Sequence, residues 1–209
     1  MTDQLGLPKY DAAQNFPPRV WQAVEATRAG NFALACLPEA GRLLQLCAGL
    51  SGISRICELG TAYGIGAAWI ESGMRPGATL LTIEHDAERA RVAGGIFADN
   101  PAIEVAHGDW SLALERAPFD MLFSDSGVKR GRGDPDRLLP LLKPGALLVL
   151  DDFTPGLSGD AAREMWLGHD AYDAVMVTLS DDAAAILARK RAAAAPAAPQ
   201  GSRSGPERG

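Results

Sequence analysis

The sequence predicts an α/β protein whose doubly wound, mostly parallel sheet has helices on both faces and closes with a C-terminal antiparallel hairpin. Short apolar segments alternate with segments of helical spacing over most of the 209 residues. Segment 146–152 (ALLVLDD) lacks the polar alternation of a half-exposed strand, which indicates a parallel strand buried on both faces. Near the end, two apolar segments flank Ser180-Asp181-Asp182, which indicates a hairpin turn.

The first part of the chain predicts two helices ahead of the sheet. Residues 1–18 are polar and contain prolines, so we expect an arm or loop there. Residues 19–30 have helical spacing and end at a glycine, and residues 37–50 begin near a proline and carry an apolar face. We therefore assign 1–36 to an N-terminal arm and helix, a candidate cap over a substrate, and begin the main domain at residue 37.

From residue 55 onward, apolar runs predict the strands, and the segments between them have helical spacing. The helix over 134–145 is expected to end at its Pro-Gly pair. The main domain extends to residue 191, and the Ala/Pro/Gly/Ser-rich segment 192–209 is expected to be a disordered tail. The predicted strands are 55–59, 78–84, 103–108, 119–125 and 146–152, and the predicted helices are 64–73, 86–100, 109–117, 134–145 and 161–169.

Composition and charge restrict the classes of function. No apolar run is long enough to span a bilayer, and the N-terminus lacks a basic-then-apolar signal, so we expect a cytoplasmic protein with no membrane partner. The net charge is −6, with the acidic residues in the body and a basic tail, which argues against nucleic acid as a partner. Cys36, Cys47 and Cys57 have apolar neighbours and no metal-ligand spacing, which predicts buried thiols.

A carboxylate stands at the end of every predicted parallel strand, which is where doubly wound sheets bind their ligands. Helix N-capping explains Asp109 and Asp152 well, but explains Asp125 poorly and Glu84 hardly at all. Glu84 ends the second strand, where an acid can accept both hydroxyls of a ribose. The complete set at the strand ends is Glu58, Glu84, Asp109, Asp125, Asp151 and Asp152.

The glycines of segment 56–70 (ICELGTAYGIGAAWI) indicate the kind of nucleoside. A dinucleotide fingerprint, G-x-G-x-x-G, rests a pyrophosphate on a helix N-terminus, whereas here the pattern is G-x-x-x-G-x-G and follows Glu58. A carboxylate beside the loop repels pyrophosphate and favours a cationic group. The pattern therefore favours a nucleoside joined to an ammonium-bearing group, which is S-adenosylmethionine, and makes a dehydrogenase the least favoured enzyme.

These segments resemble the class I S-adenosylmethionine-dependent methyltransferases, in particular the catechol- and caffeoyl-CoA-type O-methyltransferases. CELGTAYGIGA is similar to the family's E-x-G-x-x-x-G motif, and LLTIEHD is similar to its ribose-binding strand end. FDMLFSDSGVK and LKPGALLVLDDF resemble two further strands of the family, and the resemblance covers residues 37–152. It implies a Rossmann-like sheet, S-adenosylmethionine as cofactor, and methyl transfer to a small hydroxylated, catechol-like acceptor.

The same resemblance implies the residues that hold the cofactor. The loop glycines would let the backbone approach the methionine part, and Glu84 would bind the ribose hydroxyls. Asp109 and Trp110 would flank the adenine, although Trp110 is equally well explained as a core aromatic residue. His85 would cover the adenine edge or simply lie on the surface. The expected cofactor-binding residues are Glu58, Gly60, Thr61, Gly64, Glu84, His85, Gly108, Asp109, Trp110 and Asp125.

The resemblance also implies a divalent cation, Mg²⁺ or another, at Asp125, Asp151 and Asp152. Ligands that offer only oxygen suit Mg²⁺, Mn²⁺ or Ca²⁺ better than zinc. Asp125 and Lys129 would be the catalytic residues, with Lys129 as general base, the alternative being a solvated loop lysine. The family has Asp-Asn where this chain has Asp151-Asp152, and its lysine stands three residues after the strand aspartate, whereas Lys129 stands four after Asp125.

Other functions stay open at this point. The chain could be a metal-independent methyltransferase acting on another small acceptor, or a cofactor-binding protein without catalysis. The basic loop 127–134 (GVKRGRGD) could receive a carboxylate or phosphate of the substrate, or could carry only solvated charges. The apolar N-terminal helices are compatible with a homodimer.

Overall fold

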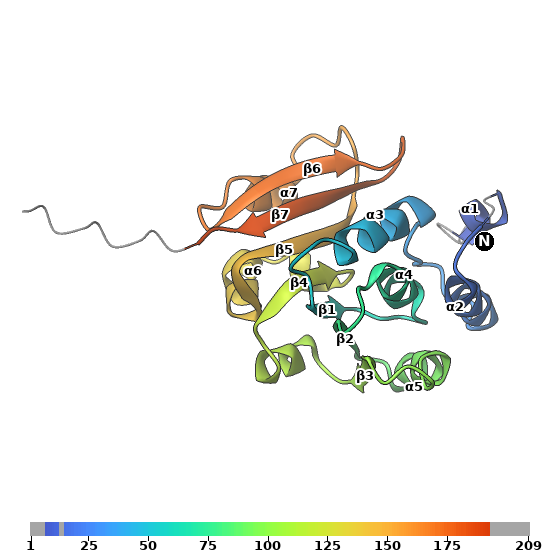
Figure 1. Ribbon diagram of the computed structural model, residues 1–209. Coiled ribbons are helices and arrows are strands. Elements are labelled where there is room, and N and C mark those ends of the chain that lie inside the picture. Colours follow the sequence, from blue (N-terminus) through green and yellow to red (C-terminus); the bar gives the residue numbers. More distant parts are fainter. Residues whose placement is uncertain (1–6, 13–14, 193–209) are drawn as a thin grey trace, which may run out of the picture.

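The computed structural model describes residues 7–12 and 15–192 and confirms the predicted fold class. The expected tail from residue 193 onward lies outside them. One seven-stranded sheet has the order β3-β2-β1-β4-β5-β7-β6, and β7 runs in the direction opposite to the other six strands (Figure 1). The strands are β1 (Arg55–Leu59), β2 (Thr79–Glu84), β3 (Ile103–His107), β4 (Phe119–Ser124), β5 (Leu142–Phe153), β6 (Tyr172–Thr178) and β7 (Ala184–Lys190).

Helices cover both faces of the sheet, as the alternation predicts. They are α1 (Leu7–Ala12), α2 (Pro18–Ala29), α3 (Pro38–Ala48), α4 (Ile65–Gly73), α5 (Ala87–Ile96), α6 (Asp134–Leu138) and α7 (Ala161–Leu167), with short 3₁₀ turns η1 (Trp110–Glu115), η2 (Gly127–Lys129) and η3 (Leu139–Leu141). Apolar side chains of α1 to α4 form the core on one face, and those of η1, α6 and α7 form the core on the other.

The strand order reverses beside β1, which lies between β2 and β4. The chain crosses from β1 to β2 through α4 on one face and from β3 to β4 through η1 on the other. Backbone hydrogen bonds continue past the strand ends, from Asp125 N to Leu59 O (2.9 Å) and from Gly60 N to Ile83 O (2.9 Å). The loops after β1, β2 and β4 are thereby held together at the crevice where such sheets bind ligands.

The predicted helix over 134–145 is wrong in its second half, because the chain is already in β5 at residue 142. Phe119 pairs with Leu142, whereas Met121 pairs with Leu147, so the β5 side contains extra residues. The Pro-Gly pair lies in this irregular segment. A bulge lets a strand accommodate a proline that cannot donate to the ladder.

The predicted loop over residues 1–18 is wrong at 7–12, where the chain forms α1. Tyr10 on this helix is fully buried. Its hydroxyl donates to the carbonyl oxygen of Cys36 (2.8 Å) and accepts from Nε1 of Trp69 (3.1 Å). The N-terminal arm therefore belongs to the core, and its role as a substrate cap stays a prediction.

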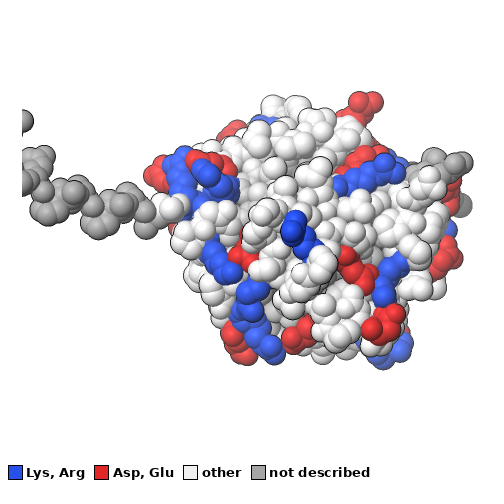
Figure 2. Space-filling model, viewed as in Figure 1, with Lys and Arg blue, Asp and Glu red and all other residues white. Residues whose placement is uncertain are grey.

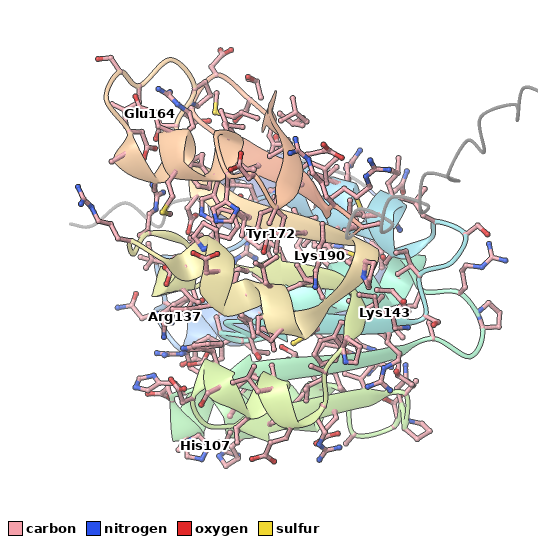
Figure 3. The ribbon with its side chains drawn as sticks, turned by 90° about the vertical axis from the view of Figure 1, so that its left-hand side faces the viewer. His107, Arg137, Lys143, Glu164, Tyr172 and Lys190 are labelled. Atoms are coloured by element: carbon pink, nitrogen blue, oxygen red, sulfur yellow. The ribbon has the colours of Figure 1, made fainter. Side chains whose placement is uncertain are left out.

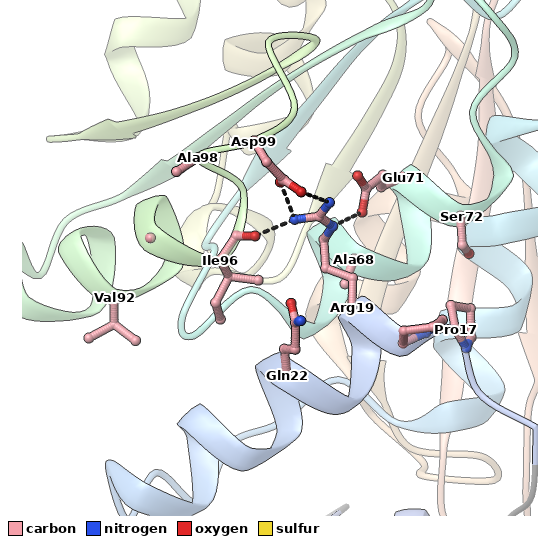
Figure 4. Close-up of a pocket in the computed structure, with 12 residues that line it drawn as sticks. Pro17, Arg19, Gln22, Ala68, Glu71, Ser72, Val92, Ile96, Ala98 and Asp99 are labelled. Carbon is pink, nitrogen blue, oxygen red and sulfur yellow. Dashed lines mark hydrogen bonds and ion pairs between the residues drawn. The ribbon is translucent and has the colours of Figure 1, made fainter.

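A cavity of about 820 Å³ lies between the start of α2 and the last turns of α4 and α5 (Figure 4). Because α4 and α5 begin at strand carboxyl ends, their last turns lie at the opposite end of the sheet from the predicted site. Arg19 binds Glu71 (2.7 Å) and Asp99 (2.7 Å) across this cavity. These ion pairs tie α2 to the two helices of that face.

The hairpin is fastened to the segment around α6 (Figure 3). The Tyr172 hydroxyl donates to the carbonyl oxygen of Pro135 (2.9 Å). The Lys190 ammonium donates to the carbonyl oxygens of Leu139 (2.9 Å) and Leu142 (2.8 Å). These bonds fix the base of β5, whose other end reaches the predicted site.

Charged side chains of both signs lie interspersed on the face seen in Figure 2, with uncharged surface between them. Basic residues form no continuous patch on that face among the described residues. Within 7–12 and 15–192, no helix combines the length and the apolar character needed to cross a membrane.

Candidate active site

The loop between β1 and α4 depends on glycine at positions with a positive φ. Gly60 and Gly64 both have φ +96°. A Cβ on Gly60 would lie 2.5 Å from the carbonyl oxygen of Asp125, and one on Gly64 would lie 3.0 Å from the Phe97 ring. Glycine therefore allows the loop to bend and lets the segment after β4 approach it closely.

Glu58 lies beneath this loop and is 1% exposed. The Thr82 hydroxyl donates to its Oε2 (2.5 Å), and Thr82 is in turn bonded to the hydroxyl of Thr61. A Cβ on Gly66 would lie 2.3 Å from Oε1 of Glu58, so the glycine leaves room for this carboxyl group. The side chain borders a space of only about 10 Å³ beside Gly60 and Thr61, which is room for roughly one water. Glu58 is thus a buried neighbour of the loop.

Burial raises the pKa of Glu58 to about 8, and the nearby carboxylates of Asp125 and Glu84 add to the rise, while the hydrogen bond from Thr82 opposes it. The folded protein consequently holds a proton on Glu58 that the unfolded chain loses near pH 4.5. A positive charge placed beside Glu58 would favour its ionised form.

We expect Glu58→Gln to remove a pH dependence of stability. The protonated carboxyl stabilises the fold fully below the unfolded pKa, and this stability is lost as pH rises toward about 8. The slope is about −1.4 kcal/mol per pH unit between the two pKa values. Urea unfolding at pH 5.5 and pH 8 should show the wild type losing stability relative to Glu58→Gln, with Glu88→Gln as an exposed control. Parallel behaviour of wild type and Glu58→Gln would contradict the assignment.

Glu84 ends β2, is 5% exposed and has both oxygens engaged. Oε2 accepts from the backbone N–H of Ala62 (2.7 Å), and Oε1 accepts from the N–H of Asp86 (2.9 Å) and from Arg89 Nη2 (2.8 Å). The Arg89 guanidinium also lies 5.0 Å from the centre of the Phe32 ring. Oε2 accepts one bond and retains capacity for a further donor.

A cavity of about 310 Å³, called here the Glu84 cavity, opens along the carboxyl ends of β1, β2, β3 and β4. Most of the predicted cofactor-binding residues meet there, namely Gly60, Glu84, His85, Gly108, Asp109, Trp110 and Asp125. Glu58 and Thr61 instead border the adjoining small space, and Gly64 caps α4. Seven of the ten predicted cofactor-binding residues thus line the Glu84 cavity, at the carboxyl ends of the strands.

The far end of the Glu84 cavity is formed by the start of η1. Asp109 caps this turn by accepting from the N–H of Ser111 (3.0 Å). Hydrogen bonding by the Ser111 side chain, and then by its backbone N–H, holds the pKa of Asp109 below its usual value. The Trp110 ring is half-buried, with the guanidinium of Arg137 at 4.8 Å from its centre. His85 is exposed on the rim. Asp109 is thus an N-cap as well as a cavity residue, and Trp110 forms part of the cavity wall in contact with Arg137.

The three predicted metal ligands, Asp125, Asp151 and Asp152, come together at the ends of β4 and β5. One oxygen of each lies within 4.8 Å of the others. Burial raises the pKa of Asp125 to about 8, against the effect of Lys129, and burial and Asp152 raise the pKa of Asp151 to about 6. Asp152 has φ +63°, which Asp and Asn tolerate better than most residues. This confined negative charge and all-oxygen donor set fit a divalent cation.

Lys129 is 2% exposed, so the alternative of a solvated loop lysine is wrong. Its ammonium lies 2.8 Å from Oδ2 of Asp152 and 3.4 Å from Oδ1 of Asp125. Its carbonyl oxygen accepts from Nε1 of the buried Trp166 (2.9 Å). The 3₁₀ turn η2 carries Lys129 back toward the strand ends, so that spacing by four residues still brings it to the aspartates.

A second cavity of about 270 Å³, called here the Phe153 cavity, lies on the other side of the aspartates. Leu37, Phe153 and Ala183 give it apolar walls, and Lys9 and Asp182 lie at its rim. Asp125, Asp152 and Leu34 line both this cavity and the Glu84 cavity. Two cavities of small-molecule size therefore meet at one carboxylate cluster.

The basic loop 127–134 is held by its own contacts. The N–H of Gly131 donates to Asp134 (2.7 Å), which is 1% exposed. Arg130 donates to the carbonyl oxygen of Asp152, with its guanidinium 4.6 Å from the centre of the Phe153 ring. Arg130 therefore supports the end of β5, and the expectation that this loop binds a substrate anion stays a prediction.

Several residues that line the two cavities escaped the sequence reasoning, among them Arg89, Phe32 and Leu34. Arg89 lies in the first turn of α5, and its pairing with Glu84 depends on how that helix follows β2, which no local spacing rule predicts. Phe32 and Leu34 lie in the connection between α2 and α3, and nothing in their local pattern predicts that this connection crosses the strand ends.

Comparisons with known proteins agree with this geometry. Residues 57–153 match a family described as a methyltransferase domain. A catechol O-methyltransferase of Mycobacterium tuberculosis is 27% identical over 164 residues, covering 75% of this chain and 66% of that protein. Another, from Niastella koreensis, is 32% identical over 136 residues, covering 59% of this chain and 60% of that protein. The chain thus spans slightly less than two thirds of the length of these relatives.

Among solved structures, an O-methyltransferase from Bacillus cereus in complex with SAH superimposes with a TM-score of 0.72 and 19% identity. The superposition covers 91% of this chain and 98% of that one, and at this identity it concerns the fold. The matched family segment runs from β1 to the end of β5 and contains the loop glycines, Glu84 and the three aspartates. The chain therefore contains a segment that matches the methyltransferase domain family, within the fold of that O-methyltransferase.

Proposed function

We propose that the protein is an O-methyltransferase that transfers the methyl group of S-adenosylmethionine to a hydroxyl of a small, catechol-like molecule with the help of a divalent cation. The observation that carries the proposal is the position of Asp125 and Asp152. Both line the Glu84 cavity and the Phe153 cavity, so a donor in the first and an acceptor in the second would meet at the carboxylates. Transfer of the methyl group from the sulfonium sulfur of the donor to the hydroxyl oxygen of the acceptor requires this alignment.

In this proposal the Glu84 cavity takes the cofactor. Oε2 of Glu84 would accept from the ribose, and the Trp110 ring would stack on the adenine beside Asp109. The Gly60 backbone lines the same cavity and would face the methionine part. Glu58 would favour the cationic end of the cofactor from below the loop.

Asp125, Asp151 and Asp152 would hold the divalent cation. A cation bound there would lower the pKa of a coordinated hydroxyl and fix two neighbouring substrate oxygens. The grouping of one oxygen from each of the three aspartates within 4.8 Å supports the proposal, because a divalent cation would bind such a set of oxygens. The Phe153 ring and Leu37 would contact the apolar ring of the acceptor.

Lys129 is the proposed general base, with Asp125 holding its side chain toward the point where the cavities meet. Its Nζ lies 3.4 Å from Oδ1 of Asp125, a residue that faces both cavities. Lys129 is 2% exposed, so its Nζ has little access to bulk solvent.

A second candidate is a metal-independent methyltransferase. The observation that favours it is the Lys129 ammonium itself, which already supplies positive charge to Asp125 and Asp152. In that case the lysine would act as a counter-ion and position the carboxylates. A cofactor-binding protein without catalysis remains the third candidate.

Calorimetric titration with S-adenosylmethionine, in Mg²⁺ and in EDTA, followed by a catechol turnover assay under both conditions, tests the proposal. We expect binding in both buffers and turnover in Mg²⁺ alone. Equal turnover in EDTA would favour the metal-independent candidate, and binding without turnover of any acceptor would favour the third.

Lys129→Met should lower kcat by roughly 100-fold or more, since general-base catalysis typically contributes about 10²–10⁴-fold. Cofactor affinity should change little. Lys143→Met is the matched control, because Lys143 lies on β5 but pairs with Asp120 at the other end of the sheet (2.6 Å). A Lys129→Met enzyme with wild-type kcat would exclude Lys129 as the base.

We also propose a cytoplasmic protein whose partner is a small-molecule acceptor, with neither nucleic acid nor a membrane as partner. A homodimer is proposed through the apolar helices near the N-terminus, where Leu46 is 64% exposed and Leu50 is 46% exposed. Light scattering coupled to size-exclusion chromatography measures the mass of the particle and decides between monomer and dimer.

A further inference from the structure

The Trp110 ring, which lines the Glu84 cavity at the end where we place the adenine, has an arginine beside it. The Arg137 guanidinium lies over this ring, 4.8 Å from its centre, and reaches it from α6 (Figure 3). Arg137 does not itself line the Glu84 cavity. Its contact therefore lies outside the cavity and leaves the part of the indole that lines the cavity for a ligand.

A buried carboxylate fixes this guanidinium. Asp134, the first residue of α6, is 1% exposed. Its Oδ1 accepts from Nη1 of Arg137 (2.9 Å), and its Oδ2 accepts from the N–H of Gly131 (2.7 Å). A buried carboxylate that lost its charged partner would strongly destabilise the protein, so this pair holds Arg137 in place. The mechanism proposed above makes no use of Asp134.

The same arrangement occurs at another part of the cavity wall. There Glu84 is the buried carboxylate, the Arg89 guanidinium binds it (2.8 Å), and the Phe32 ring lies 5.0 Å from that guanidinium. All three of these residues line the cavity. At Trp110, by contrast, the acid and the arginine lie outside the cavity and the aromatic ring alone lines it.

Arg137 also lies close enough to Asp109 to act on its charge. Hydrogen bonding by Ser111 is the main cause of the lowered pKa of Asp109, and the positive charge of Arg137 adds to it. Arg137 is therefore near both residues that we expect to flank the adenine.

We propose that Arg137 is a positioning residue for the cofactor, which holds the Trp110 ring where it stacks on the adenine, while Asp134 holds Arg137. This inference rests on the proposed function, because it takes the Glu84 cavity as the cofactor site. An indole that is free to rotate loses side-chain entropy when a ligand stacks on it, whereas a ring held by a cation has lost that entropy beforehand. Such preorganisation raises affinity without a new contact to the ligand.

Calorimetric titration with S-adenosylhomocysteine measures the effect. Arg137→Met keeps an unbranched side chain but removes the cation, and should weaken binding by about three- to tenfold, as expected for loss of a cation–π contact. Arg137→Lys keeps a cation that can pair with Asp134 and lie over the indole, and should bind within about twofold of the wild type. Arg91→Met is the matched control, because Arg91 also pairs with an acid three residues before it, Glu88, and lines neither site cavity.

A further pair of variants shows whether Arg137 acts through Trp110. In a Trp110→Leu background, adding Arg137→Met should cause no further loss of affinity, because the ring that Arg137 positions is gone. The melting temperature of each variant is measured alongside. The comparison of Arg137→Met with Arg91→Met does not depend on how well Trp110→Leu folds, since both arginine side chains are exposed.

The outcomes separate this inference from the proposed function. A loss in Arg137→Met that Arg137→Lys recovers, and that disappears in the Trp110→Leu background, supports it. Wild-type affinity in Arg137→Met overturns it, and so does a loss of the same size in the Trp110→Leu background, since Arg137 would then act by another route, such as Asp109. Arg137→Lys as weak as Arg137→Met also overturns it, because the cation would not be what holds the ring. Absence of binding to the wild type overturns the proposed function and this inference with it.

Discussion

Glu84→Ala should weaken binding of S-adenosylmethionine by about 100-fold or more. The carboxylate would accept from the ribose, each hydrogen bond to a charged group contributes roughly 1.5–3 kcal/mol, and about 1.4 kcal/mol corresponds to tenfold in affinity. Glu84 also holds the N–H of Ala62 and the side chain of Arg89, so the loop that we expect to face the cofactor loses its support. Calorimetry measures the change.

Two variants show whether this effect is local. Glu88→Ala removes an exposed carboxylate of α5, the helix that carries Arg89. Glu88 pairs only with Arg91 in the described structure, so this change should leave affinity unchanged. Glu84→Gln keeps an acceptor for the Ala62 N–H but removes the charge that Arg89 and the ribose require. An affinity loss for Glu84→Gln with an unchanged melting temperature assigns the effect to the site. Wild-type affinity in Glu84→Ala would place the cofactor elsewhere.

Gly66→Ala and Gly94→Ala should shift stability in opposite directions, although both replace a helical glycine. A Cβ at position 66 would lie 2.3 Å from Oε1 of buried Glu58 and 3.0 Å from the Phe123 ring, whereas one at position 94 meets nothing within 4 Å. Overpacking should cost Gly66→Ala about 1–3 kcal/mol. Gly94→Ala should gain about 0.5–1 kcal/mol, because alanine is the better helix former.

Thermal unfolding measures both changes, at about 2–4 °C per kcal/mol for a chain of this size. Gly66→Ala should also weaken cofactor binding, since relief of the clash displaces Glu58 or the first turn of α4. A Gly66→Ala protein as stable as Gly94→Ala would mean that Glu58 and α4 are not packed as described.

The sequence is sufficient to predict which segments form strands, because β1, β2, β4 and β5 are buried apolar runs whose character depends little on distant contacts. Their carboxyl ends must meet in a parallel sheet, so the clustering of Glu84, Asp125 and Asp151 follows from topology. The start of β5 could not be predicted in this way. Its Pro-Gly pair has the pattern of a helix stop, and only pairing with β4 keeps it within a strand.

Residues whose environment is made by distant segments were beyond prediction. Tyr10 is buried because Cys36 and Trp69 supply its hydrogen-bond partners, and local composition there indicates a loop. Lys129 lies in a polar, glycine-containing segment typical of a solvated loop, yet Asp152 and Trp166 hold it inside. Such contacts depend on tertiary packing, which is also why the position of the connection over residues 31–37 beside the strand ends left no local signal.

The most direct test of the account is a crystal structure of the protein with S-adenosylhomocysteine. We predict the adenosine in the Glu84 cavity, its ribose within hydrogen-bond distance of Glu84, and the sulfur facing Asp125 at the junction with the Phe153 cavity. Density for the ligand at another place, or a ribose that makes no contact with Glu84, would contradict the assignment of this cavity as the cofactor site.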